Sequence, residues 1–337
     1  MSAIDFAERG WLPDALIRYG IKRLLLKRLS RETSKENNFR DIVKAMSEGP
    51  LAIKTDLAND QHYEVPPTFF EIMLGKALKY SCASFENGEK DLDSAEKSML
   101  ELTMDRATIQ EHMKILELGC GWGSLTIAMA EKFPKSQIVA VSNSSAQKEF
   151  IEERFKARGI QNIEVRTSDM NDFRTDEKFD RIISIEMFEH MRNWHQLLER
   201  IHHWLNSDGR LFIHIFVHRE LAYLFDGKGG VNWMSEHFFK EGMMPAESLL
   251  PICNQHLLTD QTWRVKGTHY AKTLRAWLQK IDQNRRQATT ILTRDLGLKE
   301  AQIQWRRWRI FFMACEELFG FNGGNEWYVA HYRLIKR

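Results

Sequence analysis

The sequence predicts an α/β fold in which helices cover both faces of a doubly wound, mostly parallel β-sheet. The first observation is a regular alternation of apolar, strand-like runs and helix-like segments between Ser94 and His214, which parallel sheets produce because each crossover needs a helix. The second is the glycine-rich run GCGWG at residues 119–123, directly after the apolar run ILEL. A strand that enters a helix through such a turn is typical of nucleotide-binding cores.

The individual elements follow from local periodicity. We expect helices at residues 95–109, 124–132, 146–158 and 194–205, and strands at residues 114–118, 137–142, 163–167, 181–185 and 210–214. After Val217 the alternation stops: residues 218–256 and 271–320 have mostly helical and loop character, and further strands are predicted at residues 263–267 and 327–335. We therefore predict an N-terminal helical region and lid at residues 1–90 and a core at residues 91–337, with a helical cap inserted around its last strands.

The N-terminal region contains a basic helix and a proline break. Residues 14–29 place leucines and isoleucines at helical spacing with arginines and lysines between them. Two interpretations fit this pattern: packing on the core with a solvated basic face, which we favour, or contact with an anionic membrane surface. Pro66 and Pro67 end any helix in residues 60–70, and we expect a lid or substrate loop to start there.

Composition excludes several classes of protein. The 337 residues include 48 Lys+Arg and 46 Asp+Glu, and the net charge of +2 is too balanced to indicate a nucleic-acid groove. The four cysteines lack the spacing of a zinc site or disulfide framework, and no apolar run is long enough to span a membrane. We expect a cytoplasmic protein, monomeric or homodimeric, with no metal or nucleic-acid partner and with lipid contact limited to the periphery.

The glycine turn indicates what the core binds. Gly119 and Gly121 let the backbone turn sharply and approach a ligand, next to the free N–H groups that begin the following helix. The spacing G-x-G-x-G differs from the dinucleotide fingerprint. Glu117, two positions earlier, would repel a pyrophosphate but suits the ammonium group of S-adenosylmethionine. The sequence therefore predicts a pocket for this methyl donor.

Polar residues also follow the second and third strands, at the edge where an open α/β sheet binds its ligand. After the second strand they are Ser142, Asn143, Ser144 and Gln147. We expect their hydroxyl and amide groups to bind the ribose hydroxyls in place of the usual acid, while Ser144 or its neighbour caps the next helix. After the third strand, Asp169 has two interpretations: an acceptor for the adenine amino group, with Met170 against the ring, or the cap of a turn.

The fourth strand ends in a cluster of titratable residues. Glu186, Glu189 and His190 fall within the short run SIEMFEHM, at the sheet edge where the sulfonium of the donor should point. Two carboxylates and an imidazole crowded beside a cation and apolar groups have shifted pKa values, as an acid or base working near neutral pH requires. We predict that this cluster carries the chemistry; the alternative is a capping acid beside a surface histidine.

Segments outside the glycine turn are also distinctive: HYEVP, YSCASF, SNSSAQKEFIEE, DRIISIEMFEHM, MPAESLL, GTHYAKT and LFGFNGGNEWYVAHYRL. Together with LELGCGWGSL they resemble the plant benzylisoquinoline N-methyltransferases over residues 50–337. They are similar, in less detail, to the cyclopropane fatty-acid synthases and the mycolic-acid modifying enzymes. The resemblance implies a class I S-adenosylmethionine-dependent methyltransferase with a helical lid and with S-adenosylhomocysteine as a product.

The resemblance to the plant enzymes implies methylation of a hydrophobic, aromatic amine. It places the catalytic pair on Glu189 and His190, which would remove the proton of the amine, while Glu186 helps to hold it. An amine that is protonated has no lone pair to accept a methyl group, so its deprotonation is part of the reaction. This is the chemistry that we favour.

The resemblance to the cyclopropane synthases implies an alternative, methylene transfer to an unsaturated lipid. Those enzymes hold a bicarbonate ion that takes a proton from a lipid carbocation. The polar groups that bind this anion fall on Cys82, Glu189, His214 and Tyr270. For the substrate pocket or anion site as a whole, the expected residues are Tyr80, Cys82, Phe188, His214, His269 and Tyr270.

Overall fold

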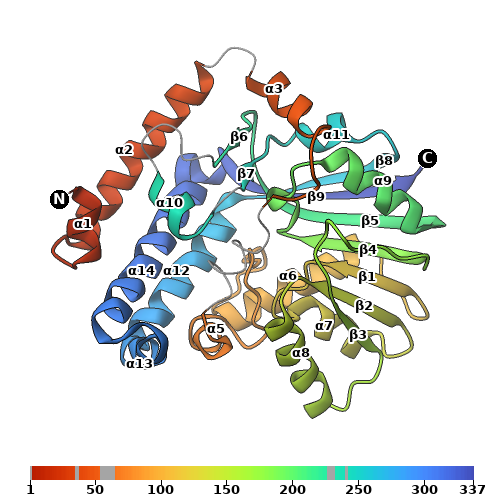
Figure 1. The fold of residues 1–337 in the computed structure, drawn as a ribbon, viewed down its shortest axis with the longest axis horizontal. Coiled ribbons are helices and arrows are strands. Elements are labelled where there is room, and N and C mark those ends of the chain that lie inside the picture. Colours follow the sequence, from red (N-terminus) through yellow and green to blue (C-terminus); the bar gives the residue numbers. More distant parts are fainter. Residues whose placement is uncertain (1, 35–37, 54–64, 226–231, 240–241) are drawn as a thin grey trace.

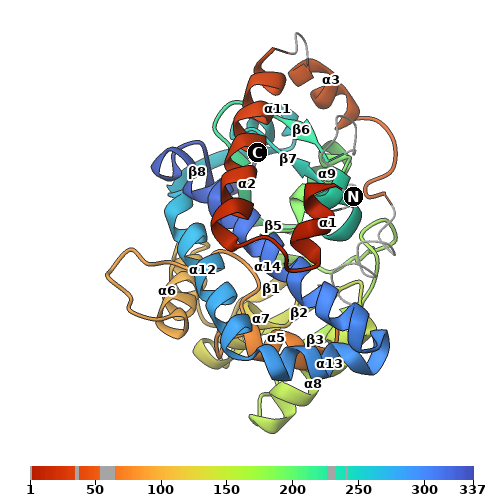
Figure 2. The same ribbon diagram turned by 90° about the vertical axis from the view of Figure 1, so that its left-hand side faces the viewer.

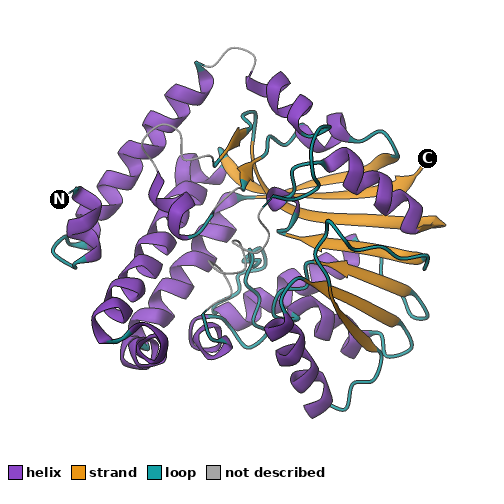
Figure 3. Cartoon of the chain, in the orientation of Figure 1, coloured by secondary structure: helices purple, strands orange, loops and turns teal. Residues whose placement is uncertain are grey.

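A mixed β-sheet forms the centre of the protein (Figures 1 and 3). The computed structural model describes residues 2–34, 38–53, 65–225, 232–239 and 242–337. Within these residues, seven strands form the sheet in the order β3-β2-β1-β4-β5-β9-β8. They are β1 (Lys114–Leu118), β2 (Gln137–Ser142), β3 (Ile163–Thr167), β4 (Phe179–Ile185), β5 (Leu205–His218), β8 (Leu257–Val265) and β9 (Trp327–Lys336).

The topology places a ligand site at the middle of this sheet. Strands β1 to β5 are mutually parallel, whereas β9 runs antiparallel to both β5 and β8. From β1 the chain proceeds outward through β2 to β3, then returns to β4 on the other side of β1. The crevice beyond the carboxyl ends of β1 and β4 is therefore the switch point at which open α/β sheets bind ligands.

Alternating apolar residues on the strands bury both faces of the sheet. On one face, Ile115 and Ile138 pack with apolar residues of α6 (Leu92–Arg106) and α7 (Ser124–Lys132), and Ile151 of α8 (Ser145–Ala157) packs on Val165. On the opposite face, Leu116 and Val139 pack with α9 (Trp194–Trp204). The expected doubly wound core is confirmed.

The remaining helices lie outside these layers or extend them, and most form an assembly beyond the carboxyl ends of the strands. They are α1 (Ala3–Glu8), α2 (Asp14–Thr33), α3 (Asn38–Ala45), α5 (Pro67–Met73), α10 (Asn232–His237), α11 (Leu249–Cys253), α12 (Gly267–Gln283), α13 (Arg285–Leu296) and α14 (Leu298–Gly320). Two short strands, β6 (Tyr223–Leu224) and β7 (Met243–Met244), pair with each other, and single 3₁₀ turns occur at η1 (Phe188–His190) and η2 (Phe321–Gly324). A large aromatic cluster that includes Trp277, Trp308 and Phe312 fills the space between α5, α12 and α14.

Helix α2 packs along α14, and Figure 2 shows it crossing in front of that helix. Ile21 and Leu25 lie against the aromatic cluster, and the guanidinium of Arg18 donates to the carboxylates of Glu316 and Glu317 at 2.7 Å each. Packing on the rest of the protein thus accounts for one face of this basic helix. No helix in the described ranges is long and apolar enough to cross a membrane.

The predicted core strands agree with the structure, and the differences have local causes. The helix expected at residues 95–109 begins at Leu92, because the Asp91 side chain caps it by accepting from the Ser94 N–H at 2.8 Å. Strand β8 begins at Leu257, six residues early, since its first half is exposed and lacks alternating apolar residues. The segment 218–256 contains the β6–β7 pair as well as helices. The lid or substrate loop expected to start at Pro66 and Pro67 is not found there: helix α5 begins at Pro67, because proline is tolerated in the first turn of a helix. Residues 60–64 lie outside the described residues.

The space around the glycine differs sharply between helices α12 and α2. A methyl group on Gly267, the first residue of α12, would lie 2.1 Å from the Trp327 carbonyl oxygen and 2.3 Å from that of Phe319. We expect Gly267→Ala to lower the free energy of unfolding by about 1–3 kcal/mol, because backbone atoms cannot easily move aside. Gly20, inside α2, has no atom within 4 Å of the same position. Gly20→Ala should therefore raise stability by about 0.5–1 kcal/mol. Urea unfolding of both variants measures this, and equal effects would contradict the packing at Gly267.

Candidate functional site

Three glycines shape the turn that follows β1. All have positive φ, at 77° for Gly119, 54° for Gly121 and 75° for Gly123, which L side chains rarely adopt. A methyl group on Gly123 would lie 2.8 Å from Ile151, and one on Gly119 would lie 3.1 Å from Met187. Gly121 instead faces open space. The turn is thus closely packed at its ends and leaves room for a ligand at its centre.

Glu117 is buried at the end of β1, and among the described residues it accepts one hydrogen bond. The hydroxyl of Thr126, on α7, donates to Glu117 Oε2 at 2.5 Å. Burial raises the pKa of Glu117 to about 7, against the lowering effect of Thr126 and of a nearby buried ammonium. A carboxyl group in this state gains from a cationic partner. Thr126 was not among the residues predicted from the sequence.

The polar residues after β2 form a hydrogen-bond network in which the amide nitrogen of Gln147 has no partner among the described residues. Ser142 Oγ donates to Gln147 Oε1 at 2.6 Å and accepts from the Ser144 N–H at 3.0 Å. Ser144 in turn caps α8 by accepting from the Gln147 N–H at 3.3 Å. Asn143 lies between the two serines. The buried Nε2 of Gln147 finds no acceptor among the described residues, so this amide can donate to a ligand without losing an existing bond.

After β3, Asp169 makes a turn. Its Oδ1 accepts from the Asn171 N–H at 2.7 Å, and its carbonyl accepts from Phe173 N–H at 2.8 Å. The turn-capping interpretation of Asp169 is therefore realised, and it does not conflict with a contact to a bound base. Met170 is buried beside it, with 7% of its surface exposed.

Glu186, directly after β4, is held by donors from three separate parts of the chain. Glu186 Oε1 accepts from the Cys82 N–H at 3.0 Å and lies 3.2 Å from His214 Nε2. Glu186 Oε2 accepts from the Tyr270 hydroxyl at 2.5 Å. Burial raises the pKa of Glu186, whereas these donors and the ammonium of Lys79 favour its ionised form. Cys82, His214 and Tyr270 thus meet at the carboxylate of Glu186, and all four residues were predicted from the sequence.

Lys79 is a functional candidate that sequence reasoning missed. Its ammonium is buried, donates to the Cys82 carbonyl at 2.8 Å and contacts the Ser81 hydroxyl. It lies close enough to Glu186 for its charge to affect the pKa of that carboxyl. The available signal was its position directly before the motif YSCASF, because a lysine followed by a buried segment must place its charge near an acid.

Glu189 and His190 form the η1 turn three residues further on. Both carboxyl oxygens of Glu189 are buried and accept no hydrogen bond from the described residues. Burial, together with the charge of Glu186, raises the pKa of Glu189 well above its ordinary value. Burial lowers the pKa of His190 to about 4, so its imidazole is neutral near pH 7. The His190 ring stacks on Phe239 at a centroid distance of 5.0 Å.

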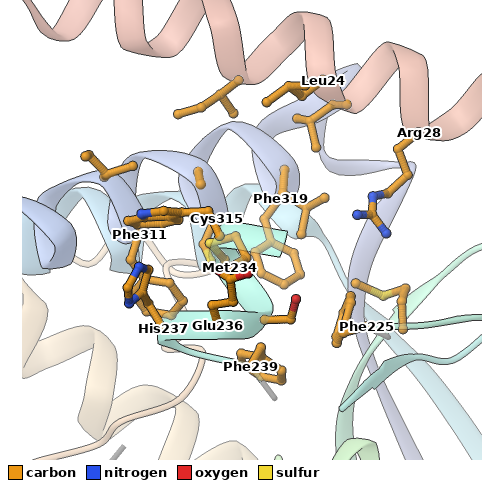
Figure 4. Close-up of a pocket in the computed structure, with 18 of the residues that line it drawn as sticks. Leu24, Arg28, Phe225, Met234, Glu236, His237, Phe239, Phe311, Cys315 and Phe319 are labelled. Atoms are coloured by element: carbon orange, nitrogen blue, oxygen red, sulfur yellow. The ribbon is translucent and has the colours of Figure 1, made fainter. Parts of the chain in front are cut away.

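These residues open into an aromatic cavity of about 710 Å³. Glu186, Glu189 and His190 form part of its wall. Figure 4 shows Leu24 and Arg28 of α2 on one side of the cavity and Phe225 and Phe239 on the opposite side. Aromatic rings that line the cavity include those of Tyr80, Phe225, Phe239, Tyr270, Phe311 and Phe319. A volume of this size accommodates a drug-sized organic molecule.

The structure places two of the expected pocket residues elsewhere. Phe188 packs edge-to-face on Trp194 in the core beneath the sheet, at 5.6 Å between ring centroids. His269 accepts from the Phe85 N–H at 2.9 Å and pairs with Glu86, so it fixes the loop before α6. Neither lines the cavity described above. His214 and the Cys82 N–H reach the site only through Glu186.

Comparison with known proteins identifies the family. The model of the family described as mycolic acid cyclopropane synthetase matches residues 53–326. The chain belongs to this family. It is 34% identical to (S)-coclaurine N-methyltransferase of Thalictrum flavum subsp. glaucum, over 98% of this chain and 94% of that enzyme. It is 26% identical to the cyclopropane-fatty-acyl-phospholipid synthase of Escherichia coli, over 67% of this chain and 56% of that enzyme.

Solved structures give the same result. The crystal structure of coclaurine N-methyltransferase bound to N-methylheliamine and S-adenosylhomocysteine matches with a TM-score of 0.95 and 32% identity, covering 98% of both chains. A cyclopropane synthase of Mycobacterium tuberculosis shares the fold, with a TM-score of 0.72 and 21% identity over 86% of this chain and all of that one. The chain is therefore an S-adenosylmethionine-dependent methyltransferase of class I fold, related to plant alkaloid N-methyltransferases.

The residues of this methyltransferase fit the methyl donor. Three features leave room for it: the open space at Gly121, the amide of Gln147 that finds no acceptor among the described residues, and the buried carboxyl of Glu117, for which Thr126 is the donor that the structure shows. We propose that Glu117 takes the ammonium group of the donor and that Gln147 takes a ribose hydroxyl. Ser142 and Ser144 would orient Gln147, with Asp169 and Met170 at the adenine.

Replacing Gln147 tests the ribose assignment. We expect Gln147→Leu to weaken S-adenosylhomocysteine binding about tenfold, the effect of one buried hydrogen bond. Stability without ligand should change by less than about 1 kcal/mol, because the lost bond from Ser142 is offset by removal of an unpartnered amide. Calorimetric titration and thermal unfolding measure the two quantities. Unchanged affinity would remove Gln147 from the donor site.

The pKa of Glu117 predicts a proton release on donor binding. Near pH 6 this carboxyl, with a pKa of about 7, is mostly protonated in the free protein. An ammonium partner lowers the pKa, so binding should release most of one proton, and affinity should rise between pH 6 and pH 8. Calorimetry of S-adenosylmethionine binding at pH 6, in buffers of different ionisation enthalpy, measures the released proton. Glu117→Gln should abolish the release, and an undiminished release in this variant would contradict the assignment.

Proposed function

We propose that this methyltransferase transfers a methyl group to the nitrogen of a hydrophobic, aromatic amine of the alkaloid type. The observation that carries the proposal is the carboxyl of Glu189, which is buried in the wall of an aromatic cavity and has no hydrogen-bond donor among the described residues. A buried carboxyl without a donor is costly. A substrate ammonium that enters the cavity would supply the missing donor.

The cavity itself supports an aromatic cation as substrate. Its volume of about 710 Å³ and its ring-lined walls suit a fused or linked aromatic amine. Aromatic faces such as those of Phe239 and Phe319 attract cations. Three of the cavity's titratable groups, Glu186, Glu189 and His190, come from one short segment after β4, so a positive nitrogen would be drawn to this part of the wall.

The mechanism follows from the state of each side chain. When bound, S-adenosylmethionine supplies a methyl group on a cationic sulfur, which becomes a neutral thioether. The amine nitrogen needs a free lone pair to form the new bond. The cationic donor and the substrate ammonium favour the ionised form of Glu189, and this carboxylate then accepts the amine proton. Because burial raises the pKa of Glu189, its proton affinity is closer to that of an amine than an exposed carboxylate's would be. His190, kept neutral by burial, offers an adjacent lone pair.

Glu186 has a different role in this proposal. Its oxygens already accept from the Cys82 N–H and the Tyr270 hydroxyl and lie within hydrogen-bonding distance of His214 Nε2. These contacts oppose the rise in pKa that burial causes, so we assign Glu186 the role of a fixed anion rather than of a proton acceptor. The positive charge passes from sulfur to nitrogen during the reaction, and a fixed anion stabilises it throughout. Glu186 would thus hold the substrate cation while Glu189 exchanges its proton.

The same geometry argues against the cyclopropane chemistry. The resemblance to cyclopropane synthases puts the bicarbonate ligands on Cys82, Glu189, His214 and Tyr270. Three of these groups here surround the Glu186 carboxylate instead, at 2.5–3.2 Å. A bicarbonate ion would have to displace a carboxylate of the same charge from its own donors. We therefore prefer amine methylation.

Glu189→Gln tests the proposal. We expect turnover of aromatic secondary amines to fall about a hundredfold near pH 7, because the amide cannot accept the proton. Raising the pH should recover part of the rate, since more amine then arrives without its proton. S-adenosylhomocysteine affinity should stay within about twofold of the parent's, because the carboxyl is not among the donor-site groups. Glu101→Gln, an exposed carboxyl on α6, is the control and should keep full activity.

The substrate class is tested with the unmodified protein. Labelled S-adenosylmethionine is incubated with a panel of aromatic amines and with monounsaturated phospholipid vesicles, each with and without added bicarbonate. Methylated amine that is independent of bicarbonate supports the proposal. A bicarbonate-dependent gain of one methylene on the phospholipid, without amine product, would overturn it.

A further inference from the structure

A line of three polar side chains runs from Glu186, after β4, across the sheet to its β8 edge. His214 Nε2 lies 3.2 Å from Glu186 Oε1, and His214 Nδ1 lies 2.8 Å from His331 Nε2. His331 Nδ1 lies 2.7 Å from Nη1 of Arg106. Neither histidine has any exposed surface. The whole line is within hydrogen-bonding distance from end to end.

The sheet fixes this line in place. His214 and His331 are directly opposite each other in the antiparallel pair of β5 and β9, and Trp263 is opposite His331 on β8. Arg106 is the last residue of α6, and its guanidinium lies over the Trp263 ring at 5.1 Å from the centroid. The arginine is thus held by an aromatic face on one side and by a histidine on the other.

The arginine gives the line a single direction. A guanidinium only donates and stays protonated in proteins, so His331 Nδ1 must be an acceptor. Burial lowers the pKa of both histidines well below the ordinary value, so each ring is neutral and carries one N–H. His331 therefore carries its hydrogen on Nε2 and donates to His214 Nδ1. His214 in turn carries its hydrogen on Nε2 and donates to Glu186.

We propose that Arg106 and His331 are positioning residues, which fix the tautomer of His214 and thereby hold the Glu186 carboxylate ionised in the methyl-transfer site. The role of Glu186 as a fixed anion rests on the proposed function; the tautomers rest on the geometry of the line and on the neutrality of both rings. Neither residue lines the cavity, and both lie far from Glu186 in the sequence. They act on it only through His214.

The line orients Glu186 but does not conduct its proton. Were His331 to carry its hydrogen on Nδ1, its Nε2 would require a donor from His214, and His214 would then present a lone pair to Glu186. That arrangement is satisfied only by a protonated Glu186 carboxyl. Arg106 excludes it, because two donors cannot face each other. The arginine also ends the line, since it cannot take up a second proton.

The tautomers are measured directly in the unmodified protein. With nitrogen-15-labelled histidine, the two ring nitrogens of a neutral imidazole differ clearly in chemical shift according to which one is protonated. We expect both His214 and His331 to be protonated at Nε2 alone near pH 7, with assignments from the variants His214→Asn and His331→Asn. A hydrogen on Nδ1 of either ring, or a charged ring, would overturn the proposal.

Variants of Arg106 test the causal step. Arg106→Met should allow a mixture of tautomers at His331 and lower the turnover of the amine substrate about tenfold, the effect of one charge-assisted hydrogen bond. Arg106→Lys retains a cationic donor and should partly restore both the single tautomer of His331 and the turnover. The matched control is Arg264→Met, because this arginine is on the same strand as Trp263 and pairs with Glu247. It should leave tautomers and turnover unchanged.

The two proposals fail in different ways. Absence of amine methylation by the unmodified protein would overturn the proposed function and leave the tautomer measurement valid. Unchanged histidine tautomers in Arg106→Met, or a loss of turnover no greater than in Arg264→Met, would overturn the positioning role while amine methylation stood.

Discussion

The hydrogen bonds to the Glu186 carboxylate join three parts of the chain that lie far apart in the sequence. The Cys82 N–H comes from the loop before α6, His214 from the middle of the sheet, and Tyr270 from α12 in the cap. Hydrogen bonds to an ionised acceptor are stronger than neutral ones, and removal of such an acceptor leaves buried donors unpaired. The Glu186 carboxylate therefore fixes the positions of the loop before α6, the sheet and the cap relative to one another around the cavity.

The backbone at Glu186 is adapted to this task. Its φ of 47° lies in the left-handed region, which is costly for a residue with a side chain and persists only where the surroundings impose it. Here the Glu186 N–H donates to the His214 carbonyl at 2.8 Å, which closes the end of β4 onto β5. The sharp turn keeps Glu186 over the sheet and lets the chain enter η1, where Glu189 reaches the cavity wall. With an ordinary negative φ at residue 186, the chain would leave β4 in another direction. Glu186 would then lose its place over the sheet, and Glu189 its place in the cavity wall.

Local patterns made the core predictable, and contacts distant in sequence made the rest unpredictable. Strands such as residues 114–118 and 137–142 are short apolar runs between clear turn signals, so their bounds follow from the residues alone. The acidic cluster at the end of β4 was visible for the same reason. His331 and Arg106 gave no such signal, because their importance comes from being aligned with His214 by the register of β5 and β9. Phe188 shows the opposite error: its place in the cluster motif suggested the pocket, but the η1 turn directs its ring into the core.

Two carboxyl groups three residues apart thus come to differ in chemistry because their surroundings differ. Glu186 is surrounded by an N–H, a hydroxyl and an imidazole, which oppose the rise in pKa that burial causes and so favour its ionised form more than that of Glu189. Glu189 has no donor among the described residues, feels the charge of Glu186 and has a raised pKa. Environments that push the pKa values of neighbouring acids apart separate an electrostatic role from a proton-transfer role. The saturation of Glu186 is what leaves Glu189 as the group that can exchange a proton with a substrate, so the division of labour is set by the donors around residue 186.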